Sequence, residues 1–153
     1  MTRTHIYEAA VTWEGATGAG YEFYSRTHEV SCAPADHPLT LSSDPAFRGD
    51  PKRYNPEQLL LAAASSCQLL SFLAVAARAR VDVVSYRDDA VAVMPEDDRP
   101  VRITAITLRP TIVVRGDASD ERILRLIDVA HKECFIANSL SSQVTIEPEI
   151  IRA

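Results

Sequence analysis

A long apolar stretch in the middle of the chain dominates its hydrophobic pattern. Residues 55–80 read NPEQLLLAAASSCQLLSFLAVAARAR, and Leu59 to Ala77 contains no charged residue, glycine or proline. Asn55 is a preferred N-cap, Pro56 suits the first helical position, and Glu57 puts negative charge in the first turn. The pattern predicts a helix of roughly 35 Å that is apolar on all faces and therefore buried. Its several polar residues and weakly hydrophobic alanines favour a protein core over a membrane.

The segments on both sides of this helix have the alternation and turn residues of β-strands. Before the helix we expect strands at 5–13 and 21–32 paired as a hairpin, a short strand at 39–42 and a loop at 43–54. After it we expect a strand at 81–93 with a bend near 87–89, its hairpin partner at 101–115, a helix from Ser119 or Asp120 to Lys132 or Glu133, a turn or short helix at 134–140, and a strand at 143–151. This order predicts an α+β fold with mainly antiparallel sheets packed around the central helix.

Composition narrows the class of protein. A chain of 153 residues, 46% hydrophobic and 24% charged, is expected to form one domain over residues 1–153. The net charge of −5 argues against nucleic acid as a partner. The first residues lack the apolar core of a secretion signal. Three cysteines are too few for a small secreted protein that is stabilised by several disulfides. We therefore expect a cytoplasmic protein without a membrane partner, in which a disulfide would be catalytic rather than structural.

Two cysteines occur in unusual surroundings. Cys67 lies in the apolar helix beside polar residues, and Cys134 follows His131 where the second helix is expected to end. Each could be a small packing residue, since free cysteine is among the most buried residue types. The two could instead form a redox pair in which one thiolate is oxidised and the other resolves it. A zinc site of Cys67, His131 and Cys134 is a third possibility, which the lack of a close ligand pair such as CxxC disfavours. We expect Cys32 to be structural.

A reactive thiol in an apolar helix needs a cation nearby, because burial disfavours the thiolate. The segment PAFRGDPKRYNPE just before and at the start of the helix supplies Arg48, Lys52 and Arg53, with Glu57 just inside the helix. These charges could equally belong to a solvated loop. Residue types alone leave both interpretations open.

Two motifs, taken together, resemble the OsmC/Ohr family of osmotically induced and organic hydroperoxide resistance proteins. The first is Asn55-Pro56-Glu57-Gln58-Leu59-Leu60 continuing through Ala62-Ala63-Ala64 to Cys67. The second is His131-Lys132-Glu133-Cys134 followed by Asn138-Ser139. The order of strands and helices also fits, so the resemblance covers nearly the whole chain. The charged loop before the helix resembles the OsmC-like branch more than the Ohr branch.

The resemblance implies a thiol-dependent peroxidase that works as an intertwined homodimer without metal or cofactor. By position, Cys67 looks like the cysteine that attacks an organic hydroperoxide, and Cys134 like the one that resolves the sulfenic acid to a disulfide. A dithiol, of lipoyl type, would reduce this disulfide. Glu57 matches the glutamate that orients an arginine, for which Arg48 is our choice and Arg53 and Arg26 are the alternatives. Phe135 departs from the family, which often has proline after the second cysteine.

Helix geometry adds an expectation about how the site is assembled. Glu57 and Cys67 are ten residues apart on one helix, which separates them by ~15 Å along its axis. An arginine held by Glu57 would span only about half of that gap, so we expect Arg48 and Glu57 of one chain to serve Cys67 and Cys134 of the other. The competing hypothesis is a non-catalytic dimeric binding protein that holds an apolar ligand in its interface cavity, with the cysteines as packing residues.

Overall fold

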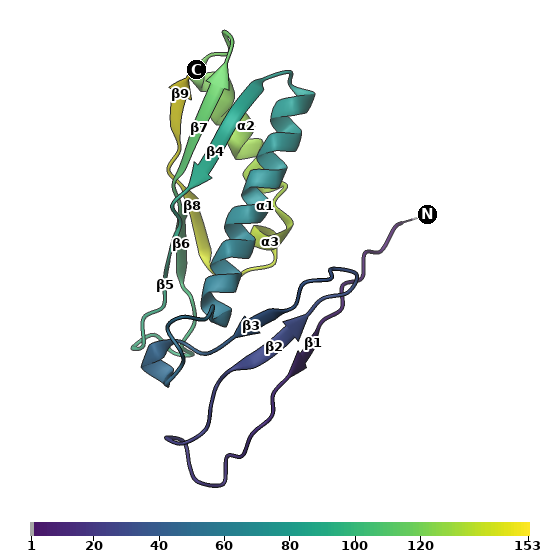
Figure 1. Cartoon of the computed structure of the whole chain (residues 1–153). Helices are drawn as coiled ribbons and strands as arrows, with labels where there is room; N and C mark the ends of the chain where they lie inside the picture. The colour runs from purple at the N-terminus through teal and green to yellow at the C-terminus, as the bar shows by residue number, and fades with distance from the viewer. Residues whose placement is uncertain (1) are drawn as a thin grey trace. The chain divides into compact units, whose positions relative to one another are not determined.

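The computed structural model describes residues 2–153 (Figure 1). Its contacts divide the chain into two compact units, of which the first ends at Leu59 and the second is Leu60–Ala153. The boundary falls within the first turns of the central helix. The expectation of one domain over residues 1–153 stays a prediction.

The first unit is built on a three-stranded antiparallel sheet. Its strands are β1 (Ala10–Thr12), β2 (His28–Ser31) and β3 (Leu39–Leu41), in that order across the sheet. The hairpin of β1 and β2 is as predicted, but both strands are much shorter than 5–13 and 21–32. The Arg26 guanidinium donates to the carbonyls of Tyr21 and Tyr24, and the Trp13 indole donates to the Ser25 carbonyl. These side chains use carbonyls that a longer strand ladder would need.

The loop between β3 and the central helix is tightly packed. A short 3₁₀ turn, η1 (Pro45–Phe47), is capped by the Asp44 carboxylate, which accepts a hydrogen bond from the Ala46 N–H at 2.7 Å. At Gly49 a Cβ atom would lie 1.5 Å from the Ser43 carbonyl oxygen, so only glycine fits. The Asn55 side chain accepts from the Gln58 N–H, and the Gln58 side chain accepts from the Asn55 N–H. This reciprocal capping box starts the helix where the sequence predicts.

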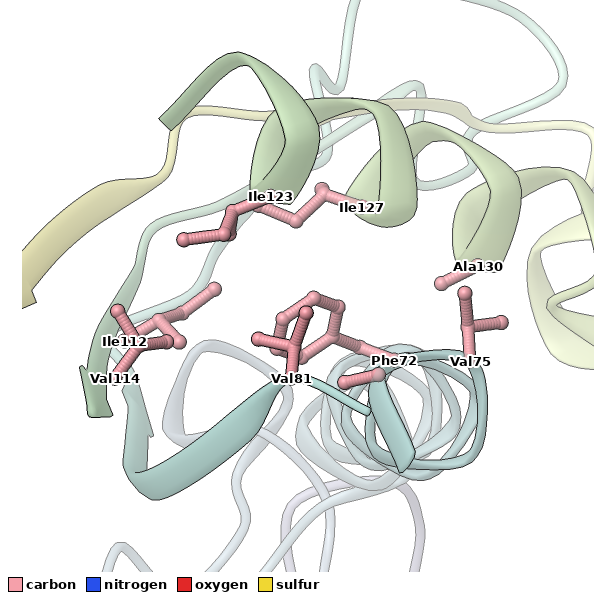
Figure 2. Packing of buried hydrophobic residues seen from close by; sticks show 9 residues of the cluster. Phe72, Val75, Val81, Ile112, Val114, Ile123, Ile127 and Ala130 are labelled. Atoms are coloured by element: carbon pink, nitrogen blue, oxygen red, sulfur yellow. The ribbon is translucent and has the colours of Figure 1, made fainter. Parts of the chain in front are cut away.

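Two helices and one sheet enclose the larger core of the second unit. Helices α1 (Pro56–Arg78) and α2 (Asp120–Lys132) pack on the same face of the sheet formed by β4 (Asp82–Asp88), β7 (Pro110–Arg115) and β9 (Glu149–Arg152) (Figure 1). Figure 2 shows the buried side chains that meet between these elements. They are Phe72, Val75, Ala76, Val81, Ile112, Val114, Ile123, Ile127 and Ala130. We call this set the larger core.

The strands of the first sheet, β4, β7 and β9, each have a neighbour in the chain that belongs to a second sheet. Strands β5 (Val91–Val93), β6 (Ala105–Leu108) and β8 (Gln143–Ile146) form it, and its smaller core consists of Ala64, Ile106 and Leu108. Each long strand that the sequence predicts here is thus two strands. The breaks lie at Asp89–Ala90, Arg109 and Glu147–Pro148, and we call them together the joint.

Arg109 holds the joint together. Its N–H donates to the Asp88 carboxylate at 2.6 Å, its carbonyl accepts from the Asp89 N–H at 3.5 Å, and its guanidinium binds the Glu147 carboxylate at 3.3 Å. The expected antiparallel pairs β4–β7 and β5–β6 are present. The pairs β6–β8 and β7–β9 are parallel, because the chain crosses over through α2 before it returns to the sheets.

The central helix is buried on one face only, so the prediction that it is buried all round is wrong for the single chain. Ala64, Gln68, Phe72, Val75 and Ala76 are buried. The exposed stripe contains Ala62, Ala63, Ser66, Leu70, Leu73, Ala74 and Ala77, and Leu70 is 64% exposed. By length and composition α1 is apolar enough to cross a membrane. Its buried face nevertheless forms part of both cores of the second unit.

Candidate active site

Cys67 lies on α1 between the two cores. Ala64, one turn before it, belongs to the smaller core, and Phe72, just over one turn after it, belongs to the larger core. The Cys67 residue itself is only partly buried. Because neither core encloses this turn of α1 completely, a thiol here combines a fixed backbone with access from outside.

Cys134 is fully buried at the end of α2. It is the N-cap of the four-residue helix α3 (Phe135–Asn138), and its Sγ accepts a hydrogen bond from the Ala137 N–H at 3.5 Å. Burial raises the pKa of the Cys134 thiol to about 11, the N–H groups of Ala137 and Ile136 oppose this rise, and the Cys67 thiol adds to it. Cys134 is therefore a neutral thiol at physiological pH.

The structure brings these two thiols together. Gln68, next to Cys67, donates its amide N–H to the Ile127 carbonyl of α2, the helix that ends just before Cys134, and Cys67 raises the pKa of Cys134. The two thiols therefore lie on neighbouring elements. Both cysteines are free thiols, as is Cys32, which is exposed just after β2 in the first unit. One partly exposed thiol beside one buried, protonated thiol can undergo oxidation and then disulfide formation.

His131 does not complete a metal site with the thiols. Among residues 2–153, no three His, Cys, Asp or Glu side chains converge as ligands for a metal ion. The carbonyl of His131 instead accepts a hydrogen bond from the Cys134 N–H at 3.2 Å. The set Cys67, His131 and Cys134 therefore lacks the arrangement that zinc requires.

The charged residues expected to assist catalysis lie in the first unit. Arg48 ends η1 in a left-handed conformation with φ of 65°, and its guanidinium pairs with the Glu22 carboxylate rather than with Glu57. Glu57 is half-buried in the first turn of α1. Arg53 is 4.0 Å from Asp50. The roles of Arg48 and Glu57 in the chemistry stay predictions.

Arg26, the other candidate cation, is held by aromatic rings. Its guanidinium lies 3.7 Å from the centroid of the Tyr24 ring and 4.6 Å from that of Tyr21. It also borders a pocket of about 310 Å³ in the first unit. The pocket is lined by Val11, Trp13, Thr17, Tyr24, Arg26, His28, Ser42, Ser43 and Pro56.

Two polar residues near the thiols have no role of their own in the sequence-based prediction, where Gln68 is only one of the polar neighbours of Cys67. Gln68 follows Cys67 and donates its amide N–H to the Ile127 carbonyl of α2 at 3.4 Å. Tyr86 of β4 packs its ring against Phe72, with centroids 6.1 Å apart. A glutamine inside an apolar helix is a usable sequence signal, because a buried amide requires partners. Nothing in the local sequence distinguishes Tyr86 from other strand tyrosines.

The fold and the thiol pair define a class: α+β proteins in which a long central helix carries one cysteine beside a buried second cysteine. The family model described as OsmC-like protein matches residues 49–149. The chain therefore belongs to the OsmC-like family, as its two motifs predict.

Solved structures agree with this assignment, whereas no curated protein matches the chain. An OsmC-like protein of unknown function from Vibrio cholerae is 30% identical, with a TM-score of 0.85 over 95% of this chain and 99% of that one. An OsmC-like protein from Mycoplasma pneumoniae is 14% identical, with a TM-score of 0.77 over 97% and 99% of the two chains. An organic hydroperoxide resistance protein from Elizabethkingia anophelis is 17% identical, with a TM-score of 0.71 over 100% of both chains.

Proposed function

We propose that this protein is a thiol-dependent peroxidase that reduces organic hydroperoxides to alcohols. The observation that carries the proposal is the pairing of partly exposed Cys67 with buried Cys134 in the second unit. Membership of a family that includes organic hydroperoxide resistance proteins supports the same reaction class. The proposed substrates are small or fatty-acid-derived hydroperoxides.

The reaction uses the two thiols in turn. The Cys67 thiolate attacks the outer oxygen of R–O–O–H, the O–O bond breaks, and the alkoxide takes up a proton to leave as the alcohol. The sulfur of Cys67 becomes a sulfenic acid. The Cys134 sulfur then attacks the Cys67 sulfur, the S–O bond breaks, and hydroxide leaves with the proton of Cys134 as water. A dithiol, of lipoyl type, reduces the resulting Cys67–Cys134 disulfide by thiol exchange.

The different surroundings of the thiols support this division of labour. A thiol is a nucleophile only after it loses its proton, and the pKa of Cys134, raised to about 11 by burial, keeps it protonated near neutral pH. Cys134 therefore does not compete for the hydroperoxide. It is positioned instead for attack on an oxidised neighbour.

We further propose that the enzyme is a cytoplasmic homodimer that acts without metal, cofactor, nucleic acid or membrane partner. The exposed apolar stripe of α1 supports a second chain as its cover, and free thiols that must be re-reduced fit a reducing compartment. In the proposed dimer, Glu57 of one chain orients Arg48, and the Arg48 guanidinium stabilises the Cys67 thiolate of the other chain.

The test is a thiol count with single cysteine variants. One equivalent of cumene hydroperoxide added to the reduced protein should consume two thiols and leave Cys32 free. Cys67→Ser should abolish peroxide consumption, whereas Cys134→Ser should allow one oxidation and stop at a trappable sulfenic acid. With dihydrolipoamide present, turnover should be faster with cumene hydroperoxide than with hydrogen peroxide. Peptide mapping that found Cys32 in the bridge would refute the assignment of the two thiols.

The alternative function is non-catalytic binding of an apolar ligand by the dimer. The observation in its favour is the pocket of about 310 Å³ in the first unit, whose lining includes Val11, Trp13, Tyr24 and Pro56. Under this alternative, Cys67→Ser and Cys134→Ser would leave ligand binding unchanged, and the wild type would not turn over cumene hydroperoxide. The thiol count therefore separates the two functions.

A further inference from the structure

Three buried polar atoms of the second unit have no hydrogen-bond partner within residues 2–153. They are Oε1 of Gln68, the hydroxyl oxygen of Tyr86 and Nδ1 of His131. Buried polar groups in native proteins are nearly always paired, so each of these atoms requires an explanation, such as an ordered water, a ligand or a chemical role.

Contacts along α1 place Tyr86 at the level of the thiols. The Ser65 hydroxyl donates to the Asp88 carboxylate at 2.5 Å, and the Phe72 ring packs against the Tyr86 ring. Strand β4 therefore runs antiparallel to this part of α1. Residues 86–88 lie alongside the turn of the helix that contains Cys67 and Gln68.

Tyr86 is also within electrostatic range of Cys134. Burial raises the pKa of the Tyr86 hydroxyl, and the negative charges of Asp88 and of the Cys134 thiolate raise it further. The phenol consequently keeps its proton throughout the physiological range. A neutral hydroxyl of this kind is a permanent hydrogen-bond donor, and within residues 2–153 it has no acceptor.

Resting on the peroxidase function proposed above, we propose that the Tyr86 hydroxyl donates a hydrogen bond to the Cys134 sulfur as this thiol loses its proton during disulfide formation. In that step the S–H bond of Cys134 and the S–O bond of the Cys67 sulfenic acid break. The S–S bond forms, and the proton leaves with hydroxide as water. Tyr86 keeps its own proton and supplies only the hydrogen bond.

In the resolving step the Cys134 thiol must lose its proton, and a hydrogen-bond donor to its sulfur makes this loss easier. A thiol with a pKa raised to about 11 by burial ionises reluctantly, and the backbone N–H groups of Ala137 and Ile136 compensate only in part. The other titratable groups around it are Cys67 on α1, His131 on α2, and Asp88 beside Tyr86 on β4. Cys67 and Asp88 contribute negative charge or none. The unpaired Tyr86 hydroxyl is a further side-chain donor here that can stabilise new negative charge on Cys134.

The first experiment needs no peroxide and is therefore independent of the proposed function. In a Cys32→Ser, Cys67→Ser background, the pKa of Cys134 is followed by the NMR shift of its Cβ, with and without Tyr86→Phe. Loss of a hydrogen bond to a charged acceptor should raise the pKa by about one unit. Fluorotyrosine at position 86 is a stronger donor and should lower it. An unchanged pKa in both proteins would overturn the proposal.

The second experiment separates the two half-reactions in rapid-mixing kinetics with cumene hydroperoxide. Tyr86→Phe should leave sulfenic acid formation at Cys67 unchanged and slow disulfide formation about tenfold. Phe72→Leu disturbs the same ring contact but keeps the hydroxyl, and Tyr54→Phe removes an exposed hydroxyl of the first unit. In both control variants the Cys67–Cys134 disulfide should form at the wild-type rate. A Phe72→Leu protein as slow as Tyr86→Phe would attribute the effect to packing and refute the donor role.

Discussion

A thiol that caps a short helix from inside the protein has two reasons to stay protonated. The Cys134 sulfur is shielded from water, and the neighbouring Cys67 disfavours a second negative charge. The hydrogen bond from the Ala137 N–H lowers the pKa of Cys134, but by less than burial raises it. At the scale of single residues, Cys67 and Cys134 carry identical thiol groups, and their surroundings alone make the two thiols behave differently.

This separation predicts how the stability of the reduced protein depends on pH. Burial raises the pKa of Cys134 from 9.0 to about 11 on folding. Below pH 9 the thiol is neutral in both states. Between pH 9 and 11 the unfolded chain releases the proton and the folded chain keeps it, so the free energy of unfolding should fall, by at most about 1.4 kcal/mol per pH unit.

Urea denaturation of the reduced protein at a series of pH values measures this effect. Cys134→Ala provides the comparison, since it removes the group while the other alkaline titrations remain. The difference in unfolding free energy between wild type and variant should be constant below pH 9 and shrink above it. Parallel curves over the whole range would contradict the raised pKa.

The residues of the site differ in how well the sequence predicts them. Cys67 and Cys134 stand out because each interrupts a local pattern, and the structure makes them neighbours. The partner of Arg48 could not be predicted, because a left-handed backbone at the end of η1 directs the side chain to Glu22. Tyr86 was missed because its importance comes from Phe72, Asp88 and Cys134, which are distant in sequence.

At the scale of elements, helices were predicted better than strands. Asn55 and Ser119 cap α1 and α2 where the sequence places them, because capping depends on residues three apart. The joint was predicted only in part, as the bend near 87–89 beside its break at Asp89–Ala90. Alternation continues across it, and Pro110 and Pro148 were its main local signals. The strands of the first unit were predicted too long, because Arg26 and Trp13 use the carbonyls of the loop.

The exposed stripe of α1 leads to a prediction about this element. Leu70 is 64% exposed and Leu73 is 38% exposed on a helix whose opposite face is buried. If a second chain covers the stripe, Leu70→Arg places a charge in an apolar interface and should weaken the dimer by about tenfold or more. Sedimentation of wild type and variant over a dilution series measures the dissociation constant.

A matched control comes from α2. Leu124 is 43% exposed on the outer side of that helix, so Leu124→Arg changes surface hydrophobicity and charge equally without touching α1. It should sediment as the wild type does. A monomeric wild type, or a dimer that Leu70→Arg leaves intact, would exclude the α1 stripe as the interface.

At the scale of the whole molecule, the proposed dimer makes a distinctive prediction about mixed assemblies. Cys67→Ser and Arg48→Ala homodimers should both be nearly inactive. If each site combines Arg48 of one chain with Cys67 of the other, refolding the two variants together creates dimers with one intact site. The statistical mixture is half mixed dimers, so activity should return to about a quarter of wild type.

The reciprocal mixture tests the same arrangement from the other side. A chain with both substitutions paired with wild type leaves no intact site if sites are shared. It leaves one intact site if each chain supplies its own Arg48. Peroxidase activity of the isolated mixed dimer, purified through two different affinity tags, distinguishes these outcomes, and an active double-variant mixture would refute the shared site.

The joint also bears on how chains of this shape can change in length over evolution. In an unbroken strand, one inserted residue turns every later side chain to the opposite face. Here all three segments stop and restart at the same level, with Arg109 linking them through Asp88, Asp89 and Glu147. An insertion or deletion at Asp89–Ala90 or Glu147–Pro148 would be absorbed between two sheets, so each sheet could keep its own pattern of inward and outward residues. The two halves of the second unit could thus acquire length changes independently.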